Sequence, residues 1–174
     1  ALPAAASVEK EGSIVNSGRW MQWRYKAAEP PGVARTDSWM LNQIFVKLRE
    51  EYKKGGVFPD PIVNLWWNYG DTEEPDVHLI AKECNGYAMD NFTHKDTVVQ
   101  KGQQIPSFAW LKDDGTTCSG NWLYCGSYTE KGNMAARRSQ KDGAYNIGLY
   151  PAFAWCWPVN RRIIYNRASV DLKG

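Results

Sequence analysis

Residues 36–56, TDSWMLNQIFVKLREEYKKGG, carry the clearest structural pattern in the chain. Large apolar side chains recur there at helical spacing and form a stripe along one side: Leu41, Ile44, Phe45, Leu48 and Tyr52. Thr36, Asp37 or Ser38 supplies a suitable N-cap, and Gly55-Gly56 ends the helix. We therefore predict an amphipathic helix over residues 37–54 that packs its apolar stripe on a core.

A second amphipathic helix is predicted over residues 75–84. Its apolar face comprises Val77, Ile80, Ala81 and Cys84. Acidic residues before and within its first turn favour its N-terminus; they are Glu73, Glu74 and Asp76. Asn85-Gly86 ends it. His78 lies off the apolar face, so we expect a solvated side chain.

The segments around these helices give weaker patterns. Two short strands are predicted at Ser7–Lys10 and Ser13–Asn16, joined by a turn at Glu11-Gly12. Residues 62–69, IVNLWWNY, fit either one helical turn or a buried strand. The interpretation of Trp20–Tyr25 stays open between strand and helix.

Helical periodicity is absent after Asp90. Short apolar runs follow, at Thr97–Gln100, Ser107–Leu111, Asn121–Cys125, Phe153–Trp157 and Ile163–Asn166. Asp113-Asp114-Gly115 predicts a turn. We predict an α+β fold: two amphipathic helices in the N-terminal half, then short strands and long loops. The predicted division is an α/β portion over residues 1–89 and a loop-rich portion over residues 90–174, which packs on something larger.

The composition limits the protein class only broadly. The 174 residues have 43% hydrophobic content and a net charge of +2, which suits one globular domain or a piece of a larger one. No apolar run reaches the ~20 residues of a membrane helix. Nine Trp and nine Tyr indicate either an aromatic core or an interface. Ala1 in place of Met indicates a processed or fragment start.

No catalytic or metal-binding residue is predicted from the chain itself. The four cysteines lack a Cys-x-x-Cys spacing, and neither His lies at ligand spacing from a Cys. A disulfide between Cys118 and Cys125 stays an alternative. No serine or cysteine has the context of a nucleophile beside a base. The acidic clusters resemble helix starts and turns more than a pair of catalytic carboxylates.

A polar turn at Asn16, Ser17, Gly18 and Arg19 has the groups that a phosphate needs. Glycine allows close backbone approach, Asn and Ser donate hydrogen bonds, and Arg offers a bidentate cation. An ordinary β-turn is the alternative. Two further basic clusters, Arg137-Arg138 and Arg161-Arg162 with Arg167, suit an anionic or acidic partner.

Several stretches resemble the later part of the catalytic subunit of respiratory, periplasmic formate dehydrogenases, which are molybdopterin oxidoreductases. They are EKEGSIVNSGRWMQW (Glu9–Trp23), PPGVARTDSWMLNQIF (Pro30–Phe45), KGQQIPSFAWLKDDGTT (Lys101–Thr117), GSYTEKGNMAARR (Gly126–Arg138) and WCWPVNRRIIYNRAS (Trp155–Ser169). The resemblance extends in the same order over nearly the whole chain. It implies a segment of a larger multidomain α/β oxidoreductase.

The resemblance also implies a cofactor and partners. Family members hold Mo or W between two molybdopterin guanine dinucleotides, carry a 4Fe–4S cluster, and oxidise formate to carbon dioxide. Asn16, Ser17, Gly18, Arg19 and Gln22 match a motif that we expect near a pterin dinucleotide. This chain has no Cys followed by His, so we expect the metal ligand and the cluster in the remainder of the subunit, and no cofactor bound wholly by this segment.

Partners implied by the resemblance are an iron–sulfur (beta) subunit, a membrane cytochrome b subunit and formate, in the periplasm, with no nucleic acid. A binding module from another class is the alternative. Exposed Trp side chains would then bind carbohydrate or single-stranded nucleic acid.

Overall fold

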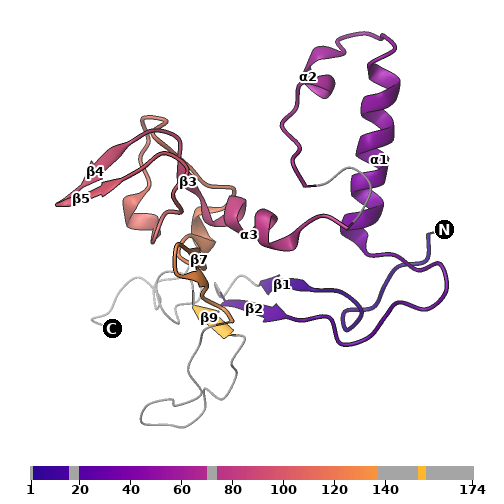
Figure 1. Ribbon diagram of the computed structural model, residues 1–174, viewed down its shortest axis with the longest axis horizontal. Helices are drawn as coiled ribbons and strands as arrows, with labels where there is room; N and C mark the ends of the chain where they lie inside the picture. The colour runs from indigo at the N-terminus through magenta and orange to yellow at the C-terminus, as the bar shows by residue number, and fades with distance from the viewer. Residues whose placement is uncertain (1, 16–19, 70–73, 137–152, 156–174) are drawn as a thin grey trace, which may run out of the picture. The chain divides into compact units, whose positions relative to one another are not determined.

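The computed structural model describes residues 2–15, 20–69, 74–136 and 153–155 and confirms an α+β fold (Figure 1). The chain divides into two compact units. Unit 1 comprises residues 1–11 and 25–80, and unit 2 comprises residues 12–24 and 81–174. The predicted division at residue 89 stays a prediction. Within the described residues, no helix is both long and apolar enough to cross a membrane.

Unit 1 is built around α1 (Asp37–Tyr52), which confirms the first predicted helix. Thr36 is the N-cap, and its hydroxyl accepts a hydrogen bond from the Trp39 N–H at 3.1 Å. Two glycines with positive φ, Gly55 and Gly56, follow the end of the helix. The local signals of capping and termination therefore placed both ends to within two residues.

The buried side of α1 differs from the predicted one. Its buried residue is Asn42, which is fully enclosed. Leu41, Ile44 and Leu48 are 63%, 56% and 41% exposed. The prediction that the stripe packs inward is therefore wrong for these three residues within the described chain, whereas Phe45 of the same stripe does pack inward, on Trp67.

Asn42 is buried because the chain folds back beside α1 after α2 (Asp60–Val63) (Figure 1). The Trp67 indole packs on Phe45, with ring centroids 4.3 Å apart. Its Nε1–H donates to Asn42 Oδ1 at 2.6 Å. A buried indole N–H requires an acceptor, so a polar residue occupies the inner face.

Replacing Asn42 with leucine should loosen the 65–69 segment from α1. The indole N–H of Trp67 would lose its acceptor, at a cost of about 1–3 kcal/mol. Trp67→Phe on top of Asn42→Leu should recover part of this loss, because no donor is then left unsatisfied. Amide hydrogen exchange of residues 65–69 measures the effect, and unchanged exchange in Asn42→Leu would contradict it.

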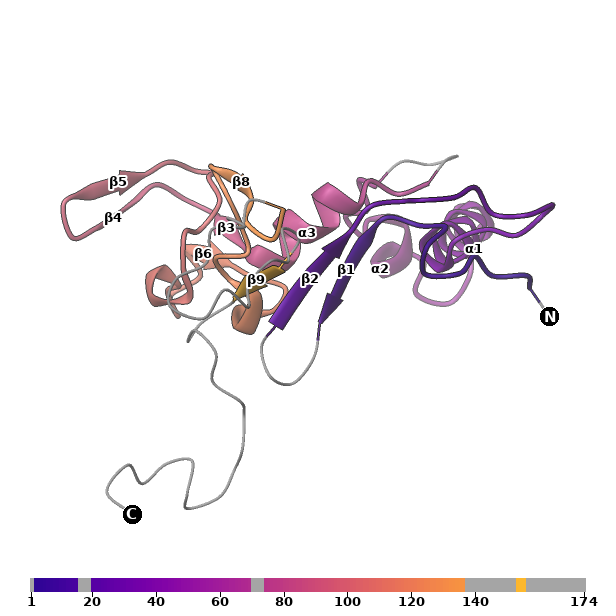
Figure 2. The ribbon, with the colours of Figure 1, turned by 90° about the horizontal axis from the view of Figure 1, so that it is seen from below.

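A three-stranded antiparallel sheet of order β1-β2-β9 lies in unit 2 (Figure 2). The strands are β1 (Gly12–Val15), β2 (Trp20–Arg24) and β9 (Phe153–Trp155). β1 confirms the predicted strand at Ser13–Asn16 over its described residues. The strand predicted at Ser7–Lys10 is wrong: the Ala6 N–H donates to the Glu9 carboxylate at 2.7 Å, and this local contact holds residues 6–9 in a turn.

The second predicted helix is confirmed as α3 (Val77–Asn85). Three small two-stranded sheets follow it: β3 (Tyr87–Ala88) with β6 (Thr117–Cys118), β4 (Phe92–His94) with β5 (Thr97–Val99), and β7 (Tyr128–Thr129) with β8 (Gly132–Asn133). Two apolar runs form 3-10 turns, η1 (Phe108–Trp110) and η2 (Trp122–Tyr124). The predicted turn at Asp113-Asp114-Gly115 is present, with Gly115 at positive φ.

The apolar core of unit 2 is small, and the buried polar side chain of Asn85 joins the backbone around it through hydrogen bonds. Ala88, Val99, Ile105 and Cys125 form the buried cluster. Asn85, at the end of α3, is fully buried beside it. Its Nδ2 donates to the carbonyls of Gly86 and Ile105, and its Oδ1 accepts from the N–H groups of Gly126 and Tyr128. One side chain thereby bonds four backbone groups in three stretches of chain, at residues 86, 105 and 126–128.

The disulfide alternative is not formed. Cys118 and Cys125 are both free thiols. Cys125 is buried in the apolar cluster, whereas Cys118 is exposed on β6. The two side chains thus occupy different environments, and spacing alone was an insufficient guide to pairing.

Candidate functional site

Asn16, Ser17, Gly18 and Arg19 lie outside the described residues, so their predicted role is untested. The strands on either side are described. Val15, the last residue of β1, pairs with Met21 of β2. Met21 and Trp23 are buried, which anchors β2 on one side. The predicted phosphate-binding stretch therefore lies in sequence between two strands that pair antiparallel with each other.

Gln22 is the described member of the predicted site. It lies in β2, opposite Ile14 on one side and Phe153 on the other. Arg24 Nε donates to Gln22 Oε1 at 3.2 Å. Because the carbonyl oxygen is engaged, the amide Nε2 is the end of this side chain left to donate to a ligand. Sequence reasoning did not anticipate this contact with Arg24.

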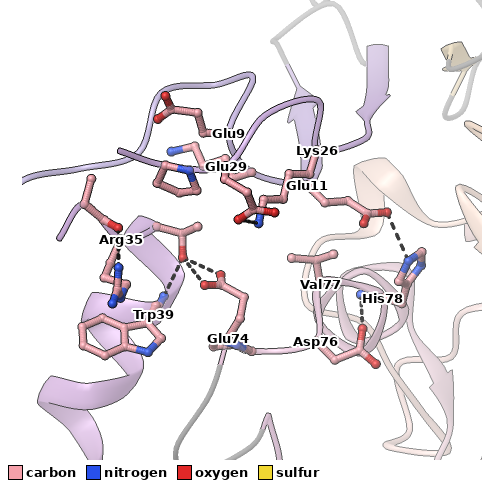
Figure 3. Close-up of a pocket in the computed structure, with 15 residues that line it drawn as sticks. Glu9, Glu11, Lys26, Glu29, Arg35, Trp39, Glu74, Asp76, Val77 and His78 are labelled. Carbon is pink, nitrogen blue, oxygen red and sulfur yellow. Dashed lines mark hydrogen bonds and ion pairs between the residues drawn. The ribbon is translucent and has the colours of Figure 1, made fainter. Parts of the chain in front are cut away.

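Unit 1 also contains a charged pocket of about 540 Å³ (Figure 3). It is lined by acidic and basic side chains together with Thr36, Trp39 and His78. The acidic ones are Glu9, Glu11, Glu29, Glu74 and Asp76, and the basic ones are Lys10, Lys26 and Arg35. No pattern in the sequence brought these residues together, because they come from three separate stretches of chain.

Most of these charges already have partners within the protein (Figure 3). Lys26 pairs with Glu29, and Lys10 pairs with Asp37. The His78 side chain is 41% exposed, as expected for a solvated histidine, and Glu11 Oε1 lies 3.3 Å from its Nε2. Asp76 accepts a hydrogen bond from the His78 N–H at 2.8 Å, in the first turn of α3, as the sequence predicted.

Glu74 has a role other than the predicted one. Its carboxylate accepts hydrogen bonds from the hydroxyls of Thr36 and Ser38. It therefore adds negative charge at the N-terminus of α1, where the helix dipole stabilises an anion. The prediction that Glu74 supports the start of the second helix is wrong, because two hydroxyl donors at α1 compete for the same carboxylate.

The donor set of this pocket does not suit a dinucleotide. Five carboxylates against three basic side chains would repel a pyrophosphate, and two of the three bases are already paired. The polar turn at Asn16–Arg19 with Gln22 has the opposite character: amide, hydroxyl and guanidinium donors with no carboxylate. Of the two places, Asn16–Arg19 with Gln22 has the donor types that a phosphate needs.

The described cysteines have no feature of a nucleophile or metal ligand. Burial, with a smaller contribution from Glu83, raises the pKa of the Cys84 thiol, which favours its protonated form. Cys125 is enclosed in the core. Across the described ranges, no group of three or more His, Cys, Asp or Glu side chains is arranged to hold a metal ion.

Comparison with known proteins gives consistent matches. A family model described as molybdopterin oxidoreductase matches residues 1–47. The chain is 48% identical over 177 residues to the formate dehydrogenase-O major subunit of Escherichia coli. It is 51% identical over 178 residues to the formate dehydrogenase subunit alpha of Megalodesulfovibrio gigas. It is also 48% identical over 177 residues to formate dehydrogenase 2 subunit alpha (cytochrome c-553) of Nitratidesulfovibrio vulgaris.

The matches cover nearly all of this chain but only a small part of each relative. Each includes 99% of this chain, but only 17% or 18% of the relative. The chain thus spans less than a fifth of the length of the curated relatives it matches. The residues matched by the family model include β1, β2 and residues 16–19 between them, and also α1 as far as Lys47.

Proposed function

Because this chain belongs to the molybdopterin oxidoreductase family, we propose that it is part of the catalytic subunit of a formate dehydrogenase. The reaction is oxidation of formate to carbon dioxide, with release of two electrons and a proton. The observation that carries the proposal is the 48% to 51% identity, along 99% of the chain, with formate dehydrogenase alpha and major subunits. The segment itself supports the cofactor and the packing of the subunit.

The proposed cofactor is bis-molybdopterin guanine dinucleotide with Mo or W, which would supply the redox chemistry for the two electrons of formate. Asn16, Ser17 and Gly18 would donate hydrogen bonds to it, and Arg19 would neutralise its phosphate charge. Gln22 would contribute its amide Nε2, since Arg24 engages the oxygen. These residues bind and orient; the metal ligand and the 4Fe–4S cluster belong to the remainder of the subunit.

The proposed partners follow from the same family. They are the rest of the catalytic subunit, an iron–sulfur (beta) subunit that accepts the electrons, and a membrane cytochrome b subunit of a respiratory complex in the periplasm. The polar hairpin is not proposed to bind nucleic acid, since its donors are explained by the dinucleotide.

The alternative of a Trp-rich binding module has less support. Several described Trp side chains are engaged inside the fold: Trp23 is 1% exposed, Trp67 bonds to Asn42, and Trp110 stacks on His94 at 4.3 Å. Trp66 and Trp122 are more exposed, at 59% and 50%. A single-stranded nucleic acid site uses several exposed rings in a row, and among the described Trp side chains each unit contributes one of these two.

Replacing Arg19 with alanine in the full-length enzyme tests the cofactor role. Loss of one charge-assisted contact should weaken cofactor affinity by about 10- to 100-fold. Pterin fluorescence after oxidation and metal content per subunit measure retention. Arg35→Ala is the matched control, since the Arg35 guanidinium donates to the Ala34 carbonyl at 2.8 Å in the acidic pocket. Full pterin and metal occupancy in Arg19→Ala would refute the assignment.

A further inference from the structure

The exposed apolar stripe of α1 has no cover within the described chain. Leu41, Ile44 and Leu48 follow each other at helical spacing, and all are more than two-fifths exposed. The neighbouring stripe of Asn42, Phe45 and Arg49, one residue further along, faces the 65–69 segment instead. Successive residues of a helix are displaced by about 100°, so the apolar stripe lies to one side of the internal contacts.

Three large aliphatic side chains in one row differ from isolated surface leucines. Single exposed apolar residues are normal, whereas a contiguous row indicates an interface. The helix propensity of this segment does not require them, because lysine or glutamate would serve equally on a solvated face. The sequence thus provides the stripe, and the described residues of the chain leave it uncovered.

The charges beside the stripe indicate the chemistry of its partner. Lys47 pairs with Glu50 at 2.7 Å, and Lys54 pairs with Glu51 at 2.6 Å. The first pair lies within α1, and the second joins its last turn to Lys54 just beyond the helix. These charges are therefore paired inside the chain. An apolar row flanked by self-paired charges suits an uncharged, tightly packed surface, as in permanent interfaces that resemble a domain core.

We propose that Leu41, Ile44 and Leu48 pack against an apolar surface on another part of the same large subunit. The length of the relatives supports this occupant: this chain matches 17% or 18% of them, while 99% of its own length is aligned. A subunit of that length has ample further chain to cover the stripe. The identity of the occupant rests on the proposed function.

Cysteine labelling in the full-length enzyme tests the proposal. Ile44→Cys should react with a maleimide about 100-fold more slowly than Val33→Cys, because a covered thiol reacts only when its surroundings open. Val33 is the matched control, since this β-branched side chain in the same unit is 77% exposed. Protection should persist in the large subunit after the other subunits are stripped away, at every protein concentration.

Each other outcome overturns the proposal in a recognisable way. Equal labelling rates would show a solvated stripe. Protection lost with the other subunits would assign the stripe to them, and protection that depends on concentration would assign it to a second copy. Pterin content, measured on the same samples, separates the two hypotheses. Rapid labelling of a pterin-loaded enzyme rejects the packing alone, whereas protection without pterin rejects the formate dehydrogenase proposal alone.

Discussion

Asn85→Ala should open unit 2 around the end of α3. The substitution removes both acceptor contacts to the Gly126 and Tyr128 N–H groups and both donor contacts to the Gly86 and Ile105 carbonyls. Asn85 is fully buried, so water does not replace these contacts without further opening. Several unsatisfied buried groups should lower the free energy of unfolding by about 3–5 kcal/mol.

Hydrogen exchange of the Gly126 and Tyr128 amides in the full-length protein measures this effect where it arises. Asn91→Ala is the matched control, because Asn91 makes one exposed bond, to the Lys101 N–H at 2.8 Å. Its cost should stay near 0.5 kcal/mol. Asn85→Asp refines the test: the carboxylate still accepts from two N–H groups but no longer donates to the two carbonyls. If Asn85→Ala were as mild as Asn91→Ala, the buried network would have no stabilising role.

Gly86→Ala should disrupt the pairing of β3 with β6. A Cβ at residue 86 would lie 2.4 Å from the Cys118 carbonyl oxygen and 2.8 Å from Ser119 Cβ. The φ of +103° adds backbone strain. Because the nearest obstacle is backbone, the Tyr87–Cys118 pair must separate, and we expect a loss of about 3 kcal/mol or more.

Gly102→Ala is the control that introduces backbone strain without the steric clash expected for Gly86→Ala. Gly102 has a φ of +86°, but a Cβ there meets nothing within 4 Å. Its cost should be about 1–2 kcal/mol, from backbone conformation alone. Thermal unfolding of the two variants in the full-length protein gives the comparison. Equal melting temperatures would contradict the close approach of residue 86 to β6.

Local signals in the sequence predicted the helices well. Thr36 caps α1, Gly55 and Gly56 follow it, and Gly86 with positive φ follows α3. Each of these signals acts within a few residues, so sequence spacing is sufficient to find it. Sequence spacing does not predict contacts between residues that are far apart in the chain. Asn85 was interpreted only as part of a helix stop, although its partners Gly126 and Tyr128 lie 41 and 43 residues away.

The inner face of α1 illustrates a second limit. Periodicity identified the apolar stripe correctly but not what covers it. Within the described chain, Asn42 is buried because it accepts the hydrogen bond of the Trp67 indole N–H. Leu41, Ile44 and Leu48 remain exposed. Amphipathic patterning identifies an apolar face; it does not identify which part of a protein covers that face.

The candidate site was reached through a motif rather than through geometry. The chemistry of Asn16–Arg19 indicated a phosphate site, and the family resemblance extended it to Gln22. The structure adds that Arg24 engages the Gln22 oxygen. It also adds the acidic pocket at Glu74, whose residues are too far apart in sequence to form a recognisable pattern.

The central claim is that this chain works as part of a pterin-bearing formate dehydrogenase. Native mass, determined together with pterin, Mo or W and iron on the protein isolated without denaturation, tests it most directly. We expect an assembly several times larger than 174 residues that contains pterin, metal and iron and oxidises formate. A folded monomer of 174 residues without pterin or metal would contradict it.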